Sequence, residues 1–325
     1  MKSPVLSILF LLISVTLLAV PNDFRFRHFS VEDGLSSNSV RAIMQDKYGF
    51  LWIGTEEGLN RYDGIMIKSY SICPQAAGKY ISSLYGTKKN IWIGTDEGIY
   101  IYAYATETFT YFDLTTPNNV RITSIVNHIL QDKDGNLWFS TNGQGLFRYN
   151  LSKNYLEQYE FTSAFGIVAS TMADSDNQIW ALTNQGESGV YKLNKAENKF
   201  EPFGLLYNAG NHHSQALAML EDSEQTLWLG TWECGLQKID KYTRQTTTYL
   251  HPTDGKGVTH IHSLMEYAPH QLLIGSDDGL LLFNTLTEEY KLFTENETVP
   301  NSLSNRFVYP IIKDREGDRK STRLN

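Results

Sequence analysis

The chain has 325 residues, of which 41% are hydrophobic, and a formal net charge of −8 at pH 7. This length and apolar content suffice for a large buried core, and the acidic balance, with no Lys or Arg run before residue 318, argues against nucleic-acid binding by this region. The two cysteines, Cys73 and Cys234, fall in different sequence repeats, so we predict no disulfide framework.

The first predicted element is an export signal at residues 1–21. A single Lys at position 2 precedes an apolar run over 5–20, which is short for a membrane-spanning helix and typical of a signal peptide. Ala19-Val20-Pro21 offers only one small residue for cleavage, so an uncleaved N-terminal anchor is the alternative. Both alternatives predict that the rest of the chain is exported.

A repeated motif organises residues 22–317. Leu-Trp-Ile-Gly-Thr at 51–55 returns with substitutions at 91, 137, 179, 227 and 272, in steps of 40, 46, 42, 48 and 45 residues. A period of this size, written in strand-forming residues, is typical of propeller blades. Repeat four replaces the Gly step with Ala181-Leu182, and repeat six has Leu273 in place of Trp. We interpret the recurring motif residues as core, and they are Trp52, Gly54, Trp92, Gly94, Trp138, Trp180, Trp228, Gly230 and Gly275.

One repeat predicts a four-stranded antiparallel blade, with strands in the first repeat at 39–44, 51–55, 59–62 and 65–70. Such a sheet cannot cover both of its faces alone, so the Trp and aliphatic side chains of one blade should pack on the next. The predicted fold is therefore all-β: a β-propeller with six complete repeats and a seventh that begins at 305–312. Residues 24–29 predict an N-terminal outer strand that closes the last blade and removes its unpaired edge.

The seventh repeat is interrupted after residue 317. Residues 318–325 are basic and lack apolar periodicity, and they resemble the translation of a widely used sequencing-library adapter. We interpret them as a non-native tail on an incomplete seven-bladed propeller that spans 22–317. A genuine short basic terminus is the alternative.

Candidate ligand-binding residues occur in the turns between second and third strands, which are longer in repeats three, four and five. These turns project from the same rim as the connections that carry His212-His213, His260 and His262. Trp232 is the one Trp outside the motif, and an exposed aromatic ring beside polar groups suits a pyranose. Ordinary polar turns are the alternative to a sugar site made of Trp232, Glu233, His212, His213, Asn184, Gln185, Asn142 and Gln144.

The other motifs in the sequence predict no metal-binding, cofactor-binding or catalytic site. The turn that starts at Asp132 begins like a calcium loop, but Gly143 stands where a bidentate Glu is required, so it is a hairpin turn. No carboxylate or Cys cluster completes a metal site around His212-His213, and we predict no metal, cofactor or catalytic constellation. We interpret a set of acidic turn residues as solvated: Glu56, Glu57, Asp96, Glu97, Asp277 and Asp278.

The residues at 29–40, 45–55 and 58–63 resemble the two-component regulator propeller family. They include Phe-Ser-Val-Glu-Asp-Gly-Leu-Ser-Ser-Asn-Ser-Val, then Gly-Phe-Leu-Trp-Ile-Gly-Thr, then Gly-Leu-Asn-Arg-Tyr-Asp, and the resemblance extends over 24–317. It implies the periplasmic sensor region of a Bacteroidetes-type hybrid two-component histidine kinase at the inner membrane. Such a sensor detects glycan-derived oligosaccharides, works as a homodimer, and controls transcription with no catalysis in this region.

Three other functions stay open. The propeller could serve another output, such as a diguanylate cyclase or a LuxR-type regulator. A secreted propeller lyase or hydrolase would place carboxylates, Tyr and His at one mouth of the channel. A purely structural interaction propeller would show a large apolar patch on its rim.

Overall fold

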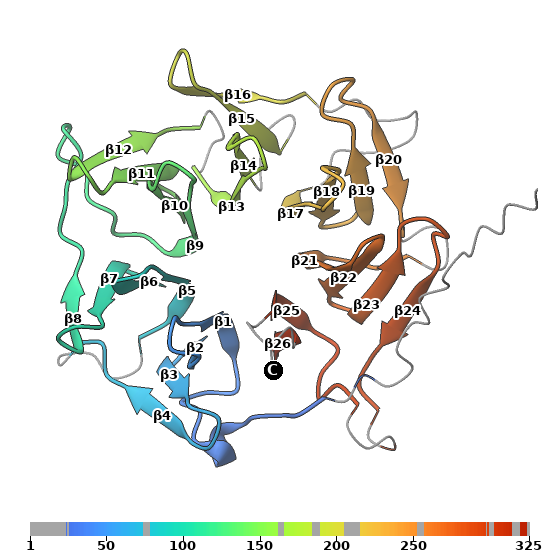
Figure 1. The fold of residues 1–325 in the computed structure, drawn as a ribbon, viewed down its shortest axis with the longest axis horizontal. Helices are drawn as coiled ribbons and strands as arrows, with labels where there is room; N and C mark the ends of the chain where they lie inside the picture. Colours follow the sequence, from blue (N-terminus) through green and yellow to red (C-terminus); the bar gives the residue numbers. More distant parts are fainter. Residues whose placement is uncertain are drawn as a thin grey trace, which may run out of the picture.

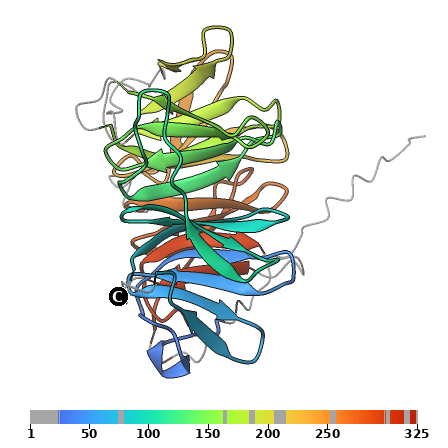
Figure 2. The same ribbon diagram turned by 90° about the vertical axis from the view of Figure 1, so that its left-hand side faces the viewer.

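The computed structural model describes residues 24, 26–73, 79–161, 166–183, 189–204, 215–251, 257–296, 298, 302–313 and 319–323. Its strands form six four-stranded antiparallel sheets and one two-stranded sheet, arranged in a ring around a central axis (Figure 1). Figure 2 shows the same ring from the side, as a flattened disc. The predicted all-β propeller is confirmed, and the described residues contain one short 3-10 helix, Val31–Asp33.

Each blade runs from its innermost to its outermost strand in chain order (Figure 1). Blade 1 consists of β1 (Val40–Gln45), β2 (Leu51–Thr55), β3 (Gly58–Tyr62) and β4 (Ile67–Tyr70), and blade 2 of β5 (Ile81–Gly86), β6 (Asn90–Thr95), β7 (Gly98–Ala103) and β8 (Thr108–Tyr111). Blade 3 consists of β9 (Val126–Gln131), β10 (Leu137–Thr141), β11 (Leu146–Asn150) and β12 (Tyr155–Tyr159), and blade 4 of β13 (Val168–Ala173), β14 (Ile179–Thr183), β15 (Val190–Asn194) and β16 (Lys199–Pro202). Blade 5 consists of β17 (Ala216–Glu221), β18 (Leu227–Thr231), β19 (Leu236–Ile239) and β20 (Thr246–Tyr249), and blade 6 of β21 (Ile261–Ala268), β22 (Gln271–Ser276), β23 (Gly279–Asn284) and β24 (Tyr290–Phe293). The seventh sheet pairs β25 (Val308–Lys313) with β26 (Arg319–Arg323).

The repeated motif forms the second strand of each blade, and its Trp side chains are buried between blades. Trp52 lies in one cluster with Ile81 and Ile91 of blade 2, and the five motif Trp residues are at most 3% exposed. In four blades the indole Nε1 also donates to the Asp six residues earlier: Trp52 to Asp46 at 2.8 Å, Trp138 to Asp132 at 2.8 Å, Trp180 to Asp174 at 3.0 Å and Trp228 to Asp222 at 2.8 Å. This contact ties the first hairpin turn of a blade to its core. The turns are the hairpins that the sequence predicts, and the bond from the indole to the Asp is an addition that only the structure shows.

The Gly of the motif lets the next blade approach closely. A Cβ on Gly54 would lie 2.5 Å from Ile81 Cγ2, which is too close for any side chain. In blade 4 Leu182 stands at the position of this Gly, and blade 5 places the small Ala216 where blade 2 has Ile81. Leu182 and Ala216 lie in one buried cluster. Between blades 4 and 5 the larger Leu replaces Gly on one side of the interface and the smaller Ala replaces Ile on the other, so the total volume is kept.

The sequence made three predictions about the ends of the chain: a seventh repeat that begins at 305–312, an N-terminal strand over 24–29 and a signal segment over 1–21. The seventh repeat begins where predicted, and residues 319–323, interpreted as part of a non-native tail, form β26 as the second strand of that sheet. The predicted strand over 24–29 is wrong, because Phe24 and residues 26–30 adopt no strand. An outer strand needs a third strand to pair with, and the described residues give the seventh sheet only two. The predicted signal segment, 1–21, lies outside the described residues.

The N-terminal segment closes the ring by side-chain packing. It runs outside the seventh sheet toward blade 6 (Figure 1). Phe24 lies 4.6 Å from Phe293 between ring centroids, and Phe24 and Phe26 pack on the buried cluster that joins Leu273 of blade 6 to Val308 of β25. No helix within the described residues has the length and hydropathy needed to cross a membrane.

Candidate functional site

Trp232 lies on one rim of the disc, in the turn after β18. It is 38% exposed, unlike the buried motif Trp residues, and its ring stacks on His260 with 3.8 Å between centroids and 28° between planes. The backbone N–H of His260 donates to the Trp232 carbonyl at 3.0 Å, and the left-handed φ of +48° at His260 turns its side chain out of the strand direction. The stack therefore holds the indole in a fixed orientation at the surface.

Asp277 connects this stack to the innermost strands. Its two carboxylate oxygens bond His260 Nδ1 and His262 Nε2, the latter at 2.7 Å. His262 stacks in turn on Tyr309 of the seventh sheet, with 4.2 Å between centroids and 16° between planes. Trp232, His260, Asp277, His262 and Tyr309 thus form a continuous line across blade 5, blade 6 and the seventh sheet, which we name the rim row.

A β-bulge positions His262 in the rim row. The pairing of β21 with β22 shifts between Ile261 and Ser263, so that His262 is the extra residue and its side chain is re-aimed. Burial lowers the pKa of His262, opposed by its bond to the Asp277 carboxylate. Burial also raises the pKa of Tyr309, so that in both side chains the neutral form is favoured. The inner end of the row is therefore a neutral, hydrogen-bonding surface at neutral pH.

Paired charges stand on neighbouring parts of the rim. Arg41, the bulge residue of β1, bonds Glu56 and lies 5.8 Å from the Tyr80 ring centroid, and Lys79 pairs with Glu97. Asp278 accepts from the backbone N–H of Thr259 at 2.8 Å. The interpretation of the acidic turns as solvated is therefore wrong for Asp277 and Asp278, which are partly buried and bonded, whereas Glu56 and Glu97 pair with cations and keep 37% and 68% of their side-chain surface exposed.

The predicted site residues are only partly brought together. Trp232 and Glu233 lie at the rim row, and both are exposed. Gln144 Oε1 accepts from the backbone N–H groups of Thr123 and Ser124, and its Nε2 donates to the Arg121 carbonyl, so its amide ties its turn to the connection that precedes β9. Asn142 pairs with Ile167 through backbone bonding in the same part of blades 3 and 4. Four of the candidates, His212, His213, Asn184 and Gln185, lie outside the described residues.

Sequence reasoning placed His260 and His262 on this rim but omitted Asp277 and Tyr309 from the site. Its position in the repeat could have identified Tyr309. His262 and Tyr309 each follow the buried aliphatic residue that begins the first strand of its blade, and a β-bulge occurs at that point in both strands. Within the described residues, no group of three or more His, Cys, Asp and Glu side chains is arranged to hold a metal ion.

Comparison with known proteins agrees with the fold. Residues 34–57 and 120–143 match the family described as Two component regulator propeller, which confirms the resemblance read from the sequence. Histidine kinase P4 of Formosa agariphila is 26% identical over 293 residues, covering 85% of this chain and 21% of that protein. The chain thus spans about a fifth of that curated relative.

Solved structures share the architecture. The extracellular domain of the putative hybrid two component system BT3049 from B. thetaiotaomicron superposes with a TM-score of 0.78 at 22% identity, covering 93% of this chain and 41% of that one. Streptogramin B lyase superposes with a TM-score of 0.67 at 16% identity, covering 89% and 92%. At these identities the likeness shows the propeller fold.

Proposed function

We propose that this chain, which carries two-component regulator propeller repeats, is the exported ligand-sensing region of a hybrid two-component sensor and binds a glycan-derived oligosaccharide at the rim row. The family match and the relation to a histidine kinase support the sensor assignment. The similar structures, which are extracellular domains of putative hybrid two component systems, support a periplasmic position. Kinase activity and transcriptional control would belong to parts of the protein beyond this propeller.

The exposed ring of Trp232 carries the proposal of a sugar ligand. Because His260 covers one face of the indole, the other face is presented in a fixed orientation, which reduces the entropy lost when a pyranose stacks on it. Glu233 follows Trp232 in the same exposed turn, Asp277 bonds the His260 that stacks on the indole, and carboxylate oxygens can accept bonds from sugar hydroxyls. Aromatic stacking next to hydrogen-bond acceptors is the recognition chemistry that a neutral sugar requires.

Sensing of this kind needs no catalysis. A ligand shifts an equilibrium between two arrangements by the difference in its affinity for them, and the shift can be passed across a membrane. The rim row crosses the joints between blade 5, blade 6 and the seventh sheet, so a bound oligosaccharide would contact all three. We propose that the states selected are two arrangements of a homodimer.

Oligosaccharide titration of matched variants tests the site. Calorimetry on the wild-type chain should show saturable binding, and Trp232→Ala should weaken it at least tenfold, about 1.4 kcal/mol. Tyr242→Ala is the matched control, because Tyr242 lies in the same blade and is 94% exposed away from the row. Equal affinity of the Trp232→Ala and Tyr242→Ala variants would contradict a site at Trp232.

A lyase or hydrolase is the second candidate, favoured by one observation. A carboxylate, two imidazoles and a phenol meet at the inner end of the rim, in Asp277, His260, His262 and Tyr309. This candidate predicts that incubated oligosaccharide is shortened and that Asp277→Asn abolishes the cleavage. The sensor proposal predicts that the ligand is recovered intact.

A further inference from the structure

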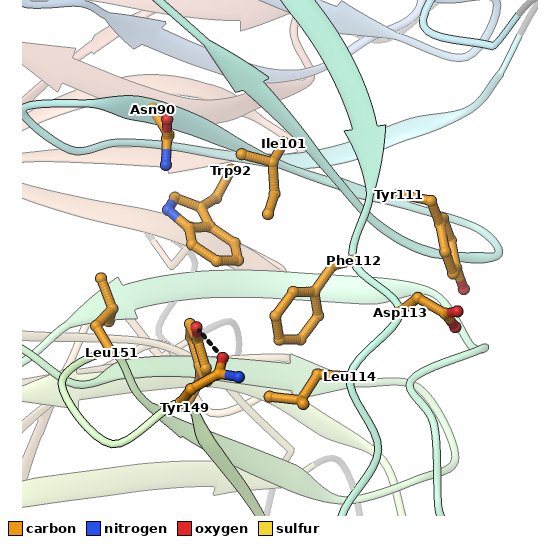
Figure 3. A pocket seen from close by; sticks show the side chains of 10 residues that line it. Asn90, Trp92, Ile101, Tyr111, Phe112, Asp113, Leu114, Tyr149 and Leu151 are labelled. Carbon is orange, nitrogen blue, oxygen red and sulfur yellow. Dashed lines mark hydrogen bonds between the residues drawn. The ribbon is translucent and has the colours of Figure 1, made fainter.

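A cavity of about 440 Å³ opens between blades 2 and 3, away from the rim row (Figure 3). Trp92 and Ile101 of blade 2 line one side, with Phe112 following β8, and Tyr149 of blade 3 lines the other. Asn90 and Asn154 add amide groups to its wall. The cavity is a shallow hollow, largely open to solvent, so a ligand there would stay partly exposed.

The cavity lies where blade 2 departs from the other Trp-containing blades. In those four blades the residue paired with the Trp across the second and third strands is a cation lying over the indole, 5.3 to 5.9 Å from its centroid: Arg61, Arg148, Lys192 and Lys238. The residue paired with Trp92 is Ile101. The ring of Trp92 therefore lacks the cationic cover that the other indoles have.

Blade 2 also lacks the Asp that accepts the indole N–H elsewhere. Its first turn is one residue shorter, since Gly86 pairs with Ile91 where Gln45 pairs with Leu51. Thr87 takes the place of Asp46, and its hydroxyl donates to the Asn90 carbonyl at 2.9 Å within the turn. Trp92 is 3% exposed, and its Nε1 has no hydrogen-bond partner among the described residues.

An unpaired buried donor destabilises the folded state, and a ligand that supplies an acceptor removes that cost. In Figure 3 the indole nitrogen is turned toward Asn90, whose amide nitrogen faces it, so two donors converge on one place. Leu151, 40% exposed, lies on the same side and is the side chain that an entering ligand would displace. The position suits an acceptor oxygen.

We propose that this cavity is a second binding site, for a neutral hexose unit. Trp92 and Phe112 are 3% and 7% exposed and form the floor of the cavity, so the sugar would lie against the half-buried Tyr149, and one of its oxygens would accept the Trp92 Nε1–H bond. A neutral ligand is favoured because the charged lining residue, Asp113, is already paired with Arg121 at 2.7 Å. The site is independent of the rim row and does not rest on the proposed sensor function.

Indole N–H resonances test the site directly. The ¹⁵N-labelled chain is titrated with methyl glucoside, methyl galactoside and methyl mannoside, with the Trp92 signal assigned through Trp92→Phe. At least one glycoside should move the Trp92 signal saturably, while the indoles bonded to Asp46, Asp132, Asp174 and Asp222 stay in place. A response at Trp232 alone would locate binding at the rim row and overturn the second site.

Ile101→Arg restores the cation of blades 1 and 3 and should reduce the hexoside affinity at least tenfold. Lys238→Ile is the matched control, because it uncovers Trp228 while leaving that indole bonded to Asp222, and it should create no new response. The competing explanation is that the Asn90 amide is turned by about 180°, so that its oxygen, and not a ligand, accepts the Trp92 Nε1–H bond. No hexoside response, together with an upfield shift of the Trp92 signal in Asn90→Ala, would establish that account and overturn the proposal.

Discussion

At the scale of single residues, the Asp of the first turn bonds both the turn and the buried indole in each blade that has one. Asp174 Oδ1 accepts from the backbone N–H groups of Asp176 and Gln178 at 3.0 and 2.8 Å, and Oδ2 accepts from Trp180 Nε1 at 3.0 Å. Three donors thus depend on one buried carboxylate. The same arrangement explains why the turn keeps its form in blades whose other turn residues differ.

Removing this carboxylate should destabilise the whole propeller. We expect Asp174→Ala to lower the free energy of unfolding by about 2–4 kcal/mol, because the buried indole N–H loses its acceptor. Asp176→Ala, two residues away in the same turn and exposed, should change it by less than about 0.5 kcal/mol. Urea denaturation at pH 7 measures both, and equal values for the two variants would contradict the role assigned to Asp174.

His128, on the innermost strand of blade 3, should make stability depend on pH. Burial lowers the pKa of His128 to about 4, whereas the unfolded chain keeps a value near 6.5. The unfolded state therefore binds the proton first, so stability is complete above about pH 6.5 and is lost as the pH falls toward 4, by up to about 3 kcal/mol.

A His128→Gln variant isolates this effect from His262 and the carboxylates, which the two proteins share. Urea midpoints recorded at pH 7 and pH 4.5 should fall further in the wild type than in the variant. Identical falls in the two proteins would show that His128 does not titrate between these pH values.

At the scale of elements, the joint between blades depends on matched volumes. Gly54→Ala places a methyl group 2.5 Å from Ile81 Cγ2 and should cost about 1–3 kcal/mol. Ile81→Ala alone leaves a cavity and should cost about 2–4 kcal/mol. The double variant copies the exchange of Leu182 with Ala216 and should cost less than the sum of the single variants, a coupling that denaturation in a double-mutant cycle measures. Additive costs would contradict the proposed exchange.

Strand order and blade count followed from the sequence because the apolar period and the turn residues recur in each repeat. Strand ends were less exact: the outer strand predicted from residue 65 begins at Ile67, since Asp63 Oδ1 accepts from the backbone N–H groups of Ile65 and Met66 and extends the turn. The predicted N-terminal strand does not form, because it would have to pair with a third strand of the seventh sheet, and the described residues give that sheet only two strands.

The candidate site was harder to predict than the fold. Trp232 was identified because it breaks the repeat, but its partners come from a different blade, so no local pattern connects them. The rim row depends on bulges that re-aim His262 and Tyr309 and on a carboxylate shared by two imidazoles. The unpaired indole of Trp92 was visible in principle, as a missing Asp and a missing cation in repeat two, once the role of both is known from the structure.

At the scale of the whole molecule, the rim row links blade 5, blade 6 and the seventh sheet through side chains on one rim, in addition to the contacts between blades in the core and the turn contact of Ser223 with Glu266. A ligand held by Trp232 at one end and Tyr309 at the other would link blade 5 to the seventh sheet. Binding to the folded state alone would then stabilise the ring, by about 2.7 kcal/mol when the ligand is present at 100 times its Kd. Thermal unfolding with and without the ligand measures this gain, which at the same ligand concentration should fall to about 1.4 kcal/mol or less in Trp232→Ala.

The central claim is that this propeller recognises a glycan fragment without transforming it. The most direct measurement is calorimetric titration of the chain with a panel of oligosaccharides, followed by chromatography of each sugar after prolonged incubation with the protein. We predict that at least one oligosaccharide binds saturably, depends on Trp232, and is recovered intact. Shortened or unsaturated products, or binding by no member of a panel that covers neutral and acidic glycans, would contradict the sensor function proposed for this chain.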